Sequence, residues 1–496
     1  MTIKEGTVIE VAGKRIPLPE GQVLIDGEWM KASSGKSFPA INPANKEKIV
    51  DVAAGNADDI KMAVESSRRA FEQKWTTMNP PERARIIYRI AELMYERREE
   101  LATIESLDNG KPLREALGDV DAAAHCFEYY AGVADKLFGQ TIPYHNRYLV
   151  YTLREPIGVC ANITPWNYPL FLGCRGLAPA IAAGNAAVLK PASEAPLSSL
   201  MLGQLALDAG LPPGVLNVVP GAGREAGAAL ATHPDIDHIA FTGSVETGML
   251  IAKMAAEGLK PCTLELGGKS PHIVFGDADI ARTVRGIIAS ITRNAGQTCS
   301  AGSRMLVHES VRDQFINGIK EAMEKMRLGP GLENPDMGPL VSKNQYDIVL
   351  RYMEIGKQEG ATAITGGGIP SEERLSHGYF VQPTLFEAPS SSLRIAQEEI
   401  FGPVLTALTF KDIDEAIAIA NGTEFGLVAS IWTSDIQRAT KLAAQVKAGQ
   451  VYINNWGAGG AESPFGGYKK SGYGRENGMD ALNVYTQTKS VISFLG

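Results

Sequence analysis

Two short apolar runs flank a segment of helical length in the stretch GVCANITPWNYPLFLGCRGLAPAIAAGNAAVLK, residues 158–190. The same alternation continues to residue 266. Further apolar runs lie at Val215–Val219, His238–Phe241 and Cys262–Leu266, and helix candidates lie at 170–182, 196–209, 223–231 and 246–257. Strands that alternate with helices predict βαβ units in a parallel, doubly wound sheet. Such sheets bind ligands at the carboxyl ends of their strands.

A second alternating block follows residue 300. Its strand candidates are Arg304–Val307, Val404–Phe410, Leu427–Trp432 and Gln450–Ile453, and its helix candidates lie near 310–326, 412–420 and 435–447. This pattern predicts a second α/β domain, joined to the first through the glycine-rich stretch Gly267–Pro271.

The region before residue 158 is predicted to be mainly helical after a short β-rich start at Val23–Trp29. One long helix is expected to begin at Pro80 and to stop at the pair Asn109-Gly110. Two β-like pieces, Tyr148–Thr152 and Val484–Phe494, stand apart from both blocks. An isolated β-ribbon of this kind often serves subunit pairing.

The composition excludes several classes of protein. The 496 residues are 44% hydrophobic and 21% charged, as in ordinary globular proteins, and the formal net charge of −8 gives no reason to expect nucleic acid or an anionic membrane as partner. Residues 1–21 lack the apolar core of a signal peptide, and no apolar run of about 18 residues occurs. We therefore expect no membrane span, and we predict a cytoplasmic protein.

Five cysteines form an odd and sparse set without a pair at metal-ligand spacing, which predicts reduced thiols and no metal site. Cys299 lies in the polar, glycine-containing segment NAGQTCSAG, residues 294–302. A lone cysteine is more often a small buried hydrophobe, but a polar loop favours an exposed, reactive thiol. The other four, which lie in apolar or helical settings, are interpreted as packing residues: Cys126, Cys160, Cys174 and Cys262.

Two polar residues could assist a nucleophilic thiol. Glu265 ends an apolar run, and burial would raise its pKa toward the range of a general base; a buried salt bridge is the alternative. Asn167 follows the first strand of the block and could donate to an oxyanion, although the local sequence favours an ordinary turn asparagine.

Three segments could bind a dinucleotide. The stretch PGAGREAG, residues 220–227, has one residue too many for the dinucleotide fingerprint, so plain turn glycines are an equal alternative. The stretch FTGS, residues 241–244, would let a pyrophosphate approach a helix N-terminus, or would serve as an ordinary N-cap. Lys190 ends a strand, where it could bind ribose or phosphate or could be solvated.

Taken together, these segments resemble the aldehyde dehydrogenase superfamily over nearly the whole chain. The motifs in the family's order are PWN at 165–167, KP at 190–191, FTGS at 241–244, LELGG at 264–268, GQTC at 296–299, EEIFGP at 398–403, PFGG at 464–467 and KSG at 470–472. The resemblance implies an NAD(P)-dependent enzyme that oxidises an aldehyde to the carboxylic acid. It also implies a homodimer or homotetramer.

The resemblance assigns parts of the chain to roles. A dinucleotide-binding domain would comprise 1–138 and 159–267, a catalytic domain 268–475, and oligomerisation segments 139–158 and 482–496. Cys299 would attack the aldehyde to give a thiohemiacetal and then a thioester, Asn167 and the Cys299 amide would hold the oxyanion, and Glu265 would activate water. The implied cofactor contacts are Ile163, Thr164, Pro165, Trp166, Lys190, Ser193, Gly223, Phe241, Gly243, Ser244, Leu266, Glu399 and Phe401.

Two choices follow from single residues. Relatives that release an acyl-coenzyme A thioester tend to lack the carboxylate of Glu265, so hydrolysis to the free acid is favoured over that alternative. Relatives that prefer NAD often have a glutamate three residues after the ribose lysine; here that position is Ser193, followed by Glu194. A serine removes the charge that repels a 2′-phosphate, so NAD or NADP is expected. A non-enzymatic binding protein with the same fold is a third hypothesis, and the intact catalytic set disfavours it.

The substrate positions differ from those of betaine-aldehyde relatives, which have an aromatic cage for a quaternary ammonium. The matching positions here are Tyr168, Arg175, Arg293 and Phe465. Two arginines would repel a cation and could pair with a carboxylate, as in succinic-semialdehyde dehydrogenases. The segment 457–463 does not match that subgroup. Structural ion pairs for both arginines, with a general aromatic or aliphatic aldehyde as substrate, are the alternative.

Overall fold

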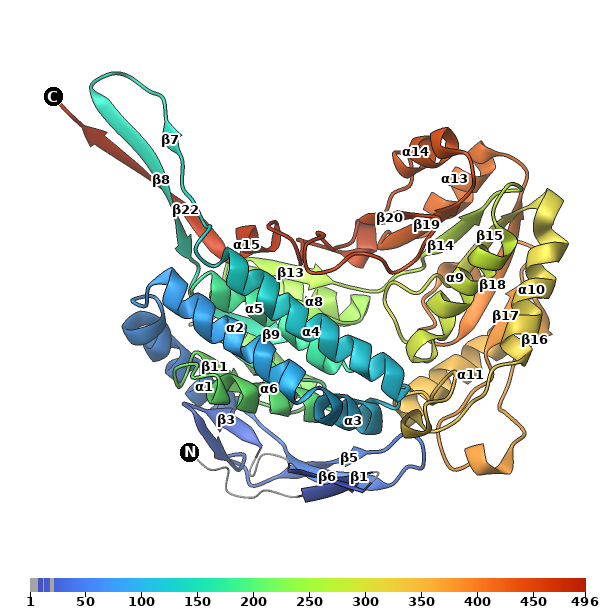
Figure 1. Ribbon diagram of the computed structural model, residues 1–496, viewed down its shortest axis with the longest axis horizontal. Coiled ribbons are helices and arrows are strands. Elements are labelled where there is room, and N and C mark those ends of the chain that lie inside the picture. The colour runs from blue at the N-terminus through green and yellow to red at the C-terminus, as the bar shows by residue number, and fades with distance from the viewer. Residues whose placement is uncertain (1–7, 12, 18–21) are drawn as a thin grey trace.

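The computed structural model describes residues 8–11, 13–17 and 22–496, and it contains the predicted doubly wound sheet (Figure 1). Five parallel strands form the centre of an eight-stranded sheet in the order β13-β12-β9-β10-β11. They are β9 (Val159–Ile163), β10 (Ala186–Lys190), β11 (Leu216–Val218), β12 (His238–Thr242) and β13 (Cys262–Glu265). Antiparallel strands complete the edges: β3 (Val23–Ile25), β4 (Glu28–Met30) and β21 (Gly472–Tyr473). The predicted fold class is therefore confirmed.

The chain reverses its direction of travel across this sheet at β9. It moves from β9 through β10 to β11 on one side, and then returns to place β12 on the other side of β9. Ile163 at the end of β9 is paired with both Lys190 and Phe241, so the three strands end at one level. A reversal of strand order opens a crevice at the carboxyl ends, where α/β proteins bind ligands.

Helices cover both faces of the first sheet because its strands are apolar on both sides. Cys160 packs in the core formed with α2 to α6, whereas Val159 and Ala161 pack in the opposite core with α1, α7 and α8. The helices are α1 (Ala57–Ala70), α2 (Pro80–Glu96), α3 (Arg98–Asn109), α4 (Leu113–Val133), α5 (Pro169–Ala182), α6 (Leu197–Asp208), α7 (Ala228–Thr232) and α8 (Val245–Glu257).

Two predicted helices differ in detail. The helix expected from Pro80 to Asn109 is two helices, because Arg97, with φ −105° and ψ 22°, leaves the helical region between α2 and α3. The helix expected at 223–231 begins as a π-helical turn, η2 (Gly223–Gly227), and continues as α7. Neither difference moves a predicted site residue.

The second predicted block forms a seven-stranded sheet in the order β16-β17-β18-β15-β14-β19-β20, parallel except for β16. Its strands are β14 (Pro271–Val274), β15 (Arg304–His308), β16 (Thr362–Thr365), β17 (Thr384–Glu387), β18 (Val404–Phe410), β19 (Val428–Trp432) and β20 (Gln450–Ile453). Its helices are α9 (Ile280–Thr292), α10 (Arg312–Glu324), α11 (Lys343–Gln358), α12 (Arg394–Gln397), α13 (Ile413–Asn421) and α14 (Ile436–Ala443). The sheet begins at Pro271, inside the stretch predicted as a linker.

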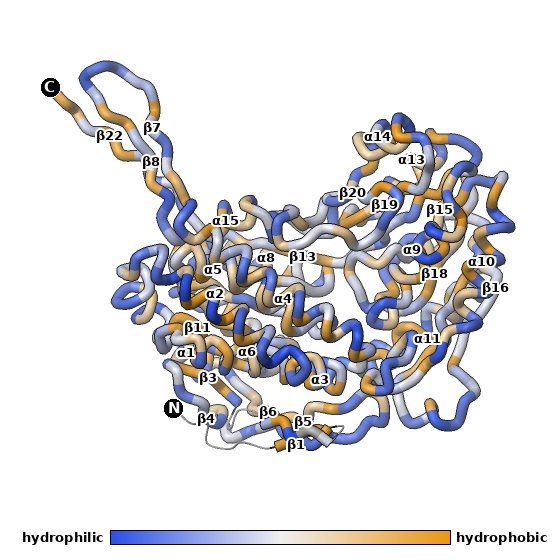
Figure 2. The backbone as a smooth tube through the Cα atoms, in the orientation of Figure 1, coloured by the Kyte–Doolittle hydropathy of each residue, from blue (hydrophilic) through white to orange (hydrophobic). Residues whose placement is uncertain are grey.

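A β-ribbon projects from the molecule beyond α15 (Ala481–Val484), and the chain ends on it (Figure 1). It consists of β7 (Thr141–Ile142), β8 (Tyr148–Pro156) and β22 (Thr486–Phe494), so the two predicted β-like pieces pair with each other. Apolar and polar residues are interspersed along it (Figure 2). Several large apolar side chains of the ribbon are exposed, among them Leu149, Leu153, Ile492 and Phe494.

The remaining strands form two antiparallel hairpins near the N-terminus, β1 (Val8–Val11) with β2 (Lys14–Pro17) and β5 (Ser37–Ile41) with β6 (Lys48–Ala53). The prediction that residues 1–21 contain no signal peptide rests partly on residues that lie outside the described ones. Among the described residues, no helix has the length and apolarity needed to span a membrane. The domain limits stay a prediction, and β21 shows that the first sheet includes a strand from the predicted catalytic segment.

Candidate active site

Cys299 follows a turn that is held in an unusual backbone conformation. Asn294, Ala295 and Gly296 have φ angles of 48°, 53° and 73°, which lie in the left-handed region that disfavours a side chain. Gly296 is also required for space, because a Cβ there would lie 2.3 Å from the carbonyl group of Gly402. A turn of this kind persists only where its surroundings hold it.

Hydrogen bonds from distant segments hold this turn. The backbone N–H of Asn294 donates to Glu115 Oε2 of α4 at 2.7 Å. The backbone N–H of Val341 donates to Gln297 Oε1 at 2.9 Å, and Gln297 is fully buried. The loop that carries Cys299 is therefore fixed from two sides.

The loop after β9 lies against the Cys299 loop. Asn167 Nδ2 donates to the Gln297 carbonyl at 3.0 Å, and Asn294 Nδ2 donates to the Asn167 carbonyl at 2.8 Å. The Tyr168 hydroxyl and Thr298 Oγ1 are 2.6 Å apart. An amide nitrogen carries two hydrogens, so Asn167 has a second one for a ligand. The first of the two sequence-predicted assistants thus lies beside the cysteine loop.

Glu265, the second predicted assistant, is the last residue of β13 and is 1% exposed. Neither carboxylate oxygen has a hydrogen-bond partner among the described residues, so the salt-bridge alternative is not supported. Gly268, three residues on, touches the cysteine loop: a Cβ there would lie 2.5 Å from the Cys299 carbonyl oxygen. The double glycine therefore lets the chain after Glu265 pass directly against Cys299.

Burial dominates the electrostatics of both groups. It raises the pKa of Cys299 to about 12, and the Arg175 guanidinium opposes that shift. Burial also raises the pKa of Glu265 well above its usual range, with a further increase from Glu476 and an opposing effect from Arg175. The carboxyl groups of Glu399 and Glu265 also raise the pKa of the Cys299 thiol.

Cys299 lines a cavity of about 400 Å³, which we call the inner pocket. All four predicted substrate residues line it. Five aromatic side chains contribute to its walls: Tyr168, Phe171, Tyr452, Trp456 and Phe465. Such a lining suits the apolar body of a small molecule.

Both arginines of the inner pocket are engaged in ion pairs. Arg175 pairs with Glu476, both side chains are nearly inaccessible, and its guanidinium lies 4.7 Å from the centroid of the Phe465 ring. Arg293 pairs with Asp119 at 2.9 Å and has a side chain that is 40% exposed. The geometry therefore favours the ion-pair interpretation of Arg175 over a free site for a substrate carboxylate.

The predicted cofactor residues after the strands gather at the crevice of the first sheet. Ile163, Lys190 and Phe241 end neighbouring strands at one level. Lys190 is buried, its Nζ donates to the Pro191 carbonyl at 2.9 Å, and burial lowers its pKa to about 8. Thr164 Oγ1 is buried without a partner among the described residues. A buried donor of this kind suits a polar ligand.

The glycine turns leave room beside these strand ends. A Cβ on Gly223 would meet nothing within 4 Å, whereas Gly243 is packed against the Phe241 ring. Ser244 is the N-cap of α8 and accepts from the Thr247 N–H, so the ordinary capping interpretation is correct for its side chain. Ser193 Oγ donates to the Gly221 carbonyl at 3.1 Å. This hydrogen bond connects the segment after Lys190 to the glycine-containing segment 220–227.

Residues of the loop between α12 and β18 complete the cofactor region. Glu399 Oε1 accepts from the Gly268 N–H at 2.8 Å, and burial raises the pKa of Glu399 to about 7. Phe401, with φ 57°, lies edge-on to Trp166 with 5.3 Å between ring centroids. Leu266 packs in the first sheet's core, and Pro165 lies in the same loop as Trp166. Predicted cofactor residues from both blocks are thus in contact with each other, through the Glu399–Gly268 and Phe401–Trp166 pairs.

Several residues of the inner pocket were not predicted. Glu476, Asp119, Phe171, Tyr452 and Trp456 contact or line the site. The buried cluster of Lys111 with Glu105 and Asp119 was missed as well; Lys111 Nζ lies 2.6 Å from Asp119 and 4.3 Å from the Tyr168 ring centroid. The sequence feature that could have indicated this cluster is Lys111 itself, which directly follows the predicted helix end at Gly110. Cys262, predicted to be a packing residue, is partly buried and packs against a core of the first sheet, and its Sγ lies 2.9 Å from the Tyr473 hydroxyl.

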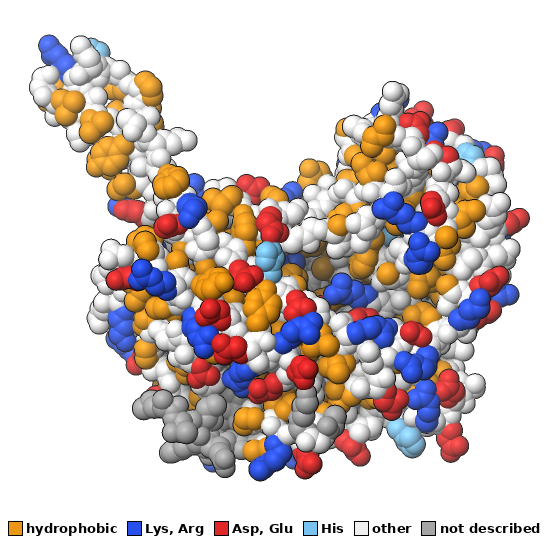
Figure 3. All heavy atoms as spheres, in the orientation of Figure 1, with side chains coloured by type: hydrophobic (Ala, Val, Ile, Leu, Met, Phe, Trp, Pro, Cys, Tyr) orange, Lys and Arg blue, Asp and Glu red, His pale blue; other side chains and the backbone are white. Residues whose placement is uncertain are grey.

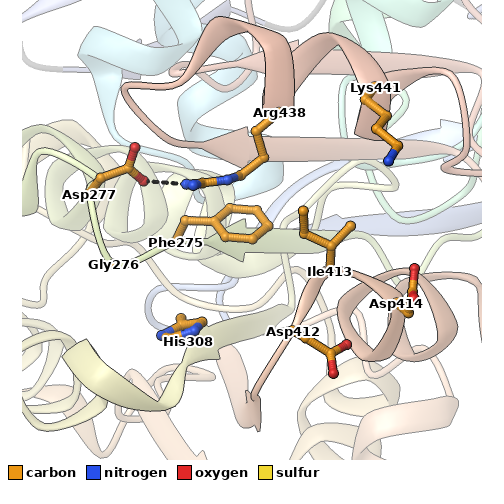
Figure 4. A pocket seen from close by; sticks show the side chains of 9 residues that line it. All are labelled: Phe275, Gly276, Asp277, His308, Asp412, Ile413, Asp414, Arg438 and Lys441. Carbon is orange, nitrogen blue, oxygen red and sulfur yellow. Dashed lines mark hydrogen bonds and ion pairs between the residues drawn. The ribbon is translucent and has the colours of Figure 1, made fainter.

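A separate cavity of about 550 Å³ lies at the carboxyl ends of β14 and β15 (Figure 4). Arg438 reaches across it to Asp277 at 2.8 Å and packs 4.8 Å from the centroid of the Phe275 ring. Asp277 also accepts from Thr433 and Ser434. These contacts hold α14 to the sheet, and the cavity contains none of the predicted site residues.

The fold and the site define a class of protein, a dinucleotide-dependent oxidoreductase with a thiol beside the cofactor crevice. The model of the aldehyde dehydrogenase family matches residues 29–491. The chain is 45% identical to an aldehyde dehydrogenase of Aspergillus niger over 492 residues, 99% of this chain and 98% of that protein. It is 44% identical to the mitochondrial aldehyde dehydrogenase of Homo sapiens, over 95% of this chain and 91% of the human protein.

A solved structure agrees with this match. An NAD+ complex of the aldehyde dehydrogenase from Bacillus cereus has a TM-score of 0.94 and 44% identity, and covers 99% of this chain and 100% of its own. The chain belongs to the aldehyde dehydrogenase family. It is an NAD(P)-dependent aldehyde dehydrogenase.

Proposed function

We propose that this enzyme oxidises aldehydes with an apolar aromatic or aliphatic body to the free carboxylic acid, through a thioester on Cys299. The observation that carries the proposal is the position of Cys299 on the inner pocket, whose lining includes five aromatic side chains. Gly268, three residues after Glu265, packs against the Cys299 carbonyl oxygen and so brings the Glu265 segment next to the thiol loop. The ion pairs of Arg175 and Arg293 support an apolar substrate, because each cation already has an anionic partner.

In the first half of the reaction, Cys299 Sγ forms a bond to the aldehyde carbon while the carbonyl electrons move to oxygen. Asn167 Nδ2 and the Cys299 N–H donate to this oxyanion. The thiol proton must leave first: the ionised Glu265 carboxylate takes it up and passes it to solvent before the second half of the reaction, and the Arg175 guanidinium favours the resulting thiolate. Collapse of the oxyanion restores the carbonyl and expels hydride. NAD(P)+, when bound, accepts that hydride.

In the second half, Glu265 removes a proton from water, which adds to the thioester carbon. Asn167 again stabilises the oxyanion. Collapse breaks the carbon–sulfur bond and releases the carboxylic acid and the Cys299 thiolate. A carboxyl group whose pKa is raised by burial is suited to hold the proton in both halves.

The residues present fit a nicotinamide dinucleotide. Lys190 and Ser193 would face the adenine ribose, Ser244 the pyrophosphate, and Glu399 with Phe401 the nicotinamide ribose. Glu194 lies close enough to Lys190 to act on its pKa, while Ser193 itself carries no charge against a 2′-phosphate. We therefore expect both NAD and NADP to be accepted. A cytoplasmic location stays a prediction.

The test is NAD(P)H formation by wild type and Cys299→Ala with a panel of neutral aromatic, aliphatic and short semialdehyde substrates, each with both cofactors. Wild type should oxidise the neutral aldehydes, and the variant should lose at least about 10³-fold in kcat. Product analysis with coenzyme A present should give the free acid. Activity retained by Cys299→Ala would contradict the mechanism.

A further inference from the structure

The inner pocket adjoins a second, wider cavity of about 760 Å³, which we call the outer cavity. The two cavities share four lining residues: Arg293, Trp456, Gly118 and Gly457. The face of the molecule in Figure 3 is hollowed between its two lobes, and Lys and Arg side chains lie beside the hollow. A substrate longer than the inner pocket would extend into this outer cavity.

The lining of the outer cavity contains four cations and two carboxylates. Arg114 has Asp336 as its partner at 3.9 Å, and Arg293 has Asp119. Glu115 is held by the Asn294 N–H. These charges are therefore satisfied within the protein.

The other two cations are not compensated. Arg285 on α9 is exposed and has no ion-pair partner among the described residues. Lys325, just after α10, has only Glu321 at 3.5 Å, and both side chains are more than two-thirds exposed, so that pair contributes little. The outer cavity thus carries a net positive charge on a protein whose formal charge is −8.

We propose that the outer cavity selects long aldehydes that carry a carboxylate at the end distant from the aldehyde, with Arg285 and Lys325 as the specificity-determining cations. This inference rests on the proposed function, since the aldehyde end must reach Cys299. The apolar middle of the substrate occupies the inner pocket, and its anionic end lies in the outer cavity. Short semialdehydes gain nothing, because their carboxylate stays in the inner pocket, where Arg175 is already paired.

The experiment compares linear ω-oxo carboxylates of increasing chain length with the matched n-alkanals. For wild type, the ratio of kcat/KM for acid over alkanal should rise with chain length once the chain spans the inner pocket. The ratio should fall as salt increases from about 0.02 M to about 0.5 M, because screening acts on exposed charges. Arg285→Glu should lower kcat/KM about fivefold or more for the long acids and leave the alkanals unchanged.

Arg282→Glu is the matched control, because it makes the same charge change on an exposed side chain of α9 that does not line the outer cavity. It should leave the ratio unchanged. An acid-to-alkanal ratio that is independent of chain length, or equal in Arg285→Glu and wild type, overturns the inference. Absence of oxidation for every aldehyde would instead overturn the proposed function, so the two failures are distinguishable.

Discussion

At the scale of single residues, the site is a set of buried charges that do not balance. Glu265 and Glu476 are both nearly inaccessible, and the Arg175 guanidinium acts on both. An ionised carboxylate without a hydrogen-bond partner is costly to bury. Burial therefore favours the protonated form of Glu265, and this form must release its proton before the carboxylate can act as a base.

The pH dependence of stability should reveal this cost. The pKa of Glu265 is higher in the folded protein than in the unfolded chain. As pH rises past about 4.5, Glu265 therefore ionises in the unfolded chain before it ionises in the folded protein, and the free energy of unfolding falls above that pH. We expect Glu265→Gln to be more stable than wild type at pH 7 by more than about 1 kcal/mol, with the difference vanishing near pH 4. Urea unfolding at the two pH values measures it.

Glu96→Gln, a change at an exposed carboxylate of α2, is the control and should shift stability little at either pH. A Glu265→Gln variant less stable than wild type at neutral pH would show that the carboxylate is ionised and paired in the folded protein. The variant should also lose hydrolysis of the thioester, because the amide cannot act as a base.

At the scale of elements, the first helices of the chain support the catalytic loop. α4 contributes Glu115, which binds the Asn294 N–H, and Asp119, which binds both Lys111 and Arg293. The three left-handed residues before Cys299 would relax without these contacts. Glu115 is thus a positioning residue for the nucleophile.

Substitutions at Glu115 test this role. Glu115→Ala should lower both the rate of alkylation of Cys299 by iodoacetamide and kcat by about tenfold, because a buried hydrogen bond is worth about 1–1.5 kcal/mol. Glu115→Gln keeps an acceptor oxygen and should restore most of the rate. The KM for NAD should be unchanged in both variants, since Glu115 lies outside the cofactor crevice. Equal losses of alkylation rate and kcat in Glu115→Ala and Glu115→Gln would instead show that the negative charge of Glu115 is required rather than its hydrogen bond.

At the scale of the whole molecule, the projecting ribbon exposes large apolar side chains that no other part of the described chain covers. β22 pairs with β8 along its whole length, yet its Ile492 and Phe494 are 64% and 62% exposed. Exposed apolar side chains on a β-ribbon are typical of an interface between subunits. We propose that the ribbon joins copies of this chain into a homodimer or homotetramer.

Ile492→Asp should shift the enzyme toward the monomer in light-scattering measurements, because a charge in an apolar interface is costly to bury. Ser493→Asp is the control, because residue 493 follows Ile492 in β22 and its side chain points to the opposite face of the strand; it should keep the wild-type mass. A wild-type enzyme that is monomeric at every concentration would contradict the proposal.

Local periodicity was sufficient to predict much of the fold. The five central strands, β9 to β13, came from apolar runs bounded by turns, and most helices between them came from their apolar faces. The start of β14 at Pro271 was missed, because proline and the preceding glycines favour a loop in isolation. The break at Arg97 was missed too, since both of its sides have strong helical periodicity.

The sequence by itself determined the family and nominated Cys299, Glu265, Asn167 and the cofactor residues, because those motifs are short, ordered segments of chain. Only the tertiary structure decided what the arginines do. Arg175 finds Glu476 and Arg293 finds Asp119 across long stretches of sequence, and no local pattern encodes such a pairing. The same holds for the outer cavity, where α9 and α10 bring Arg285 and Lys325 to one opening. Charge acts through space, so its partners depend on how the chain folds.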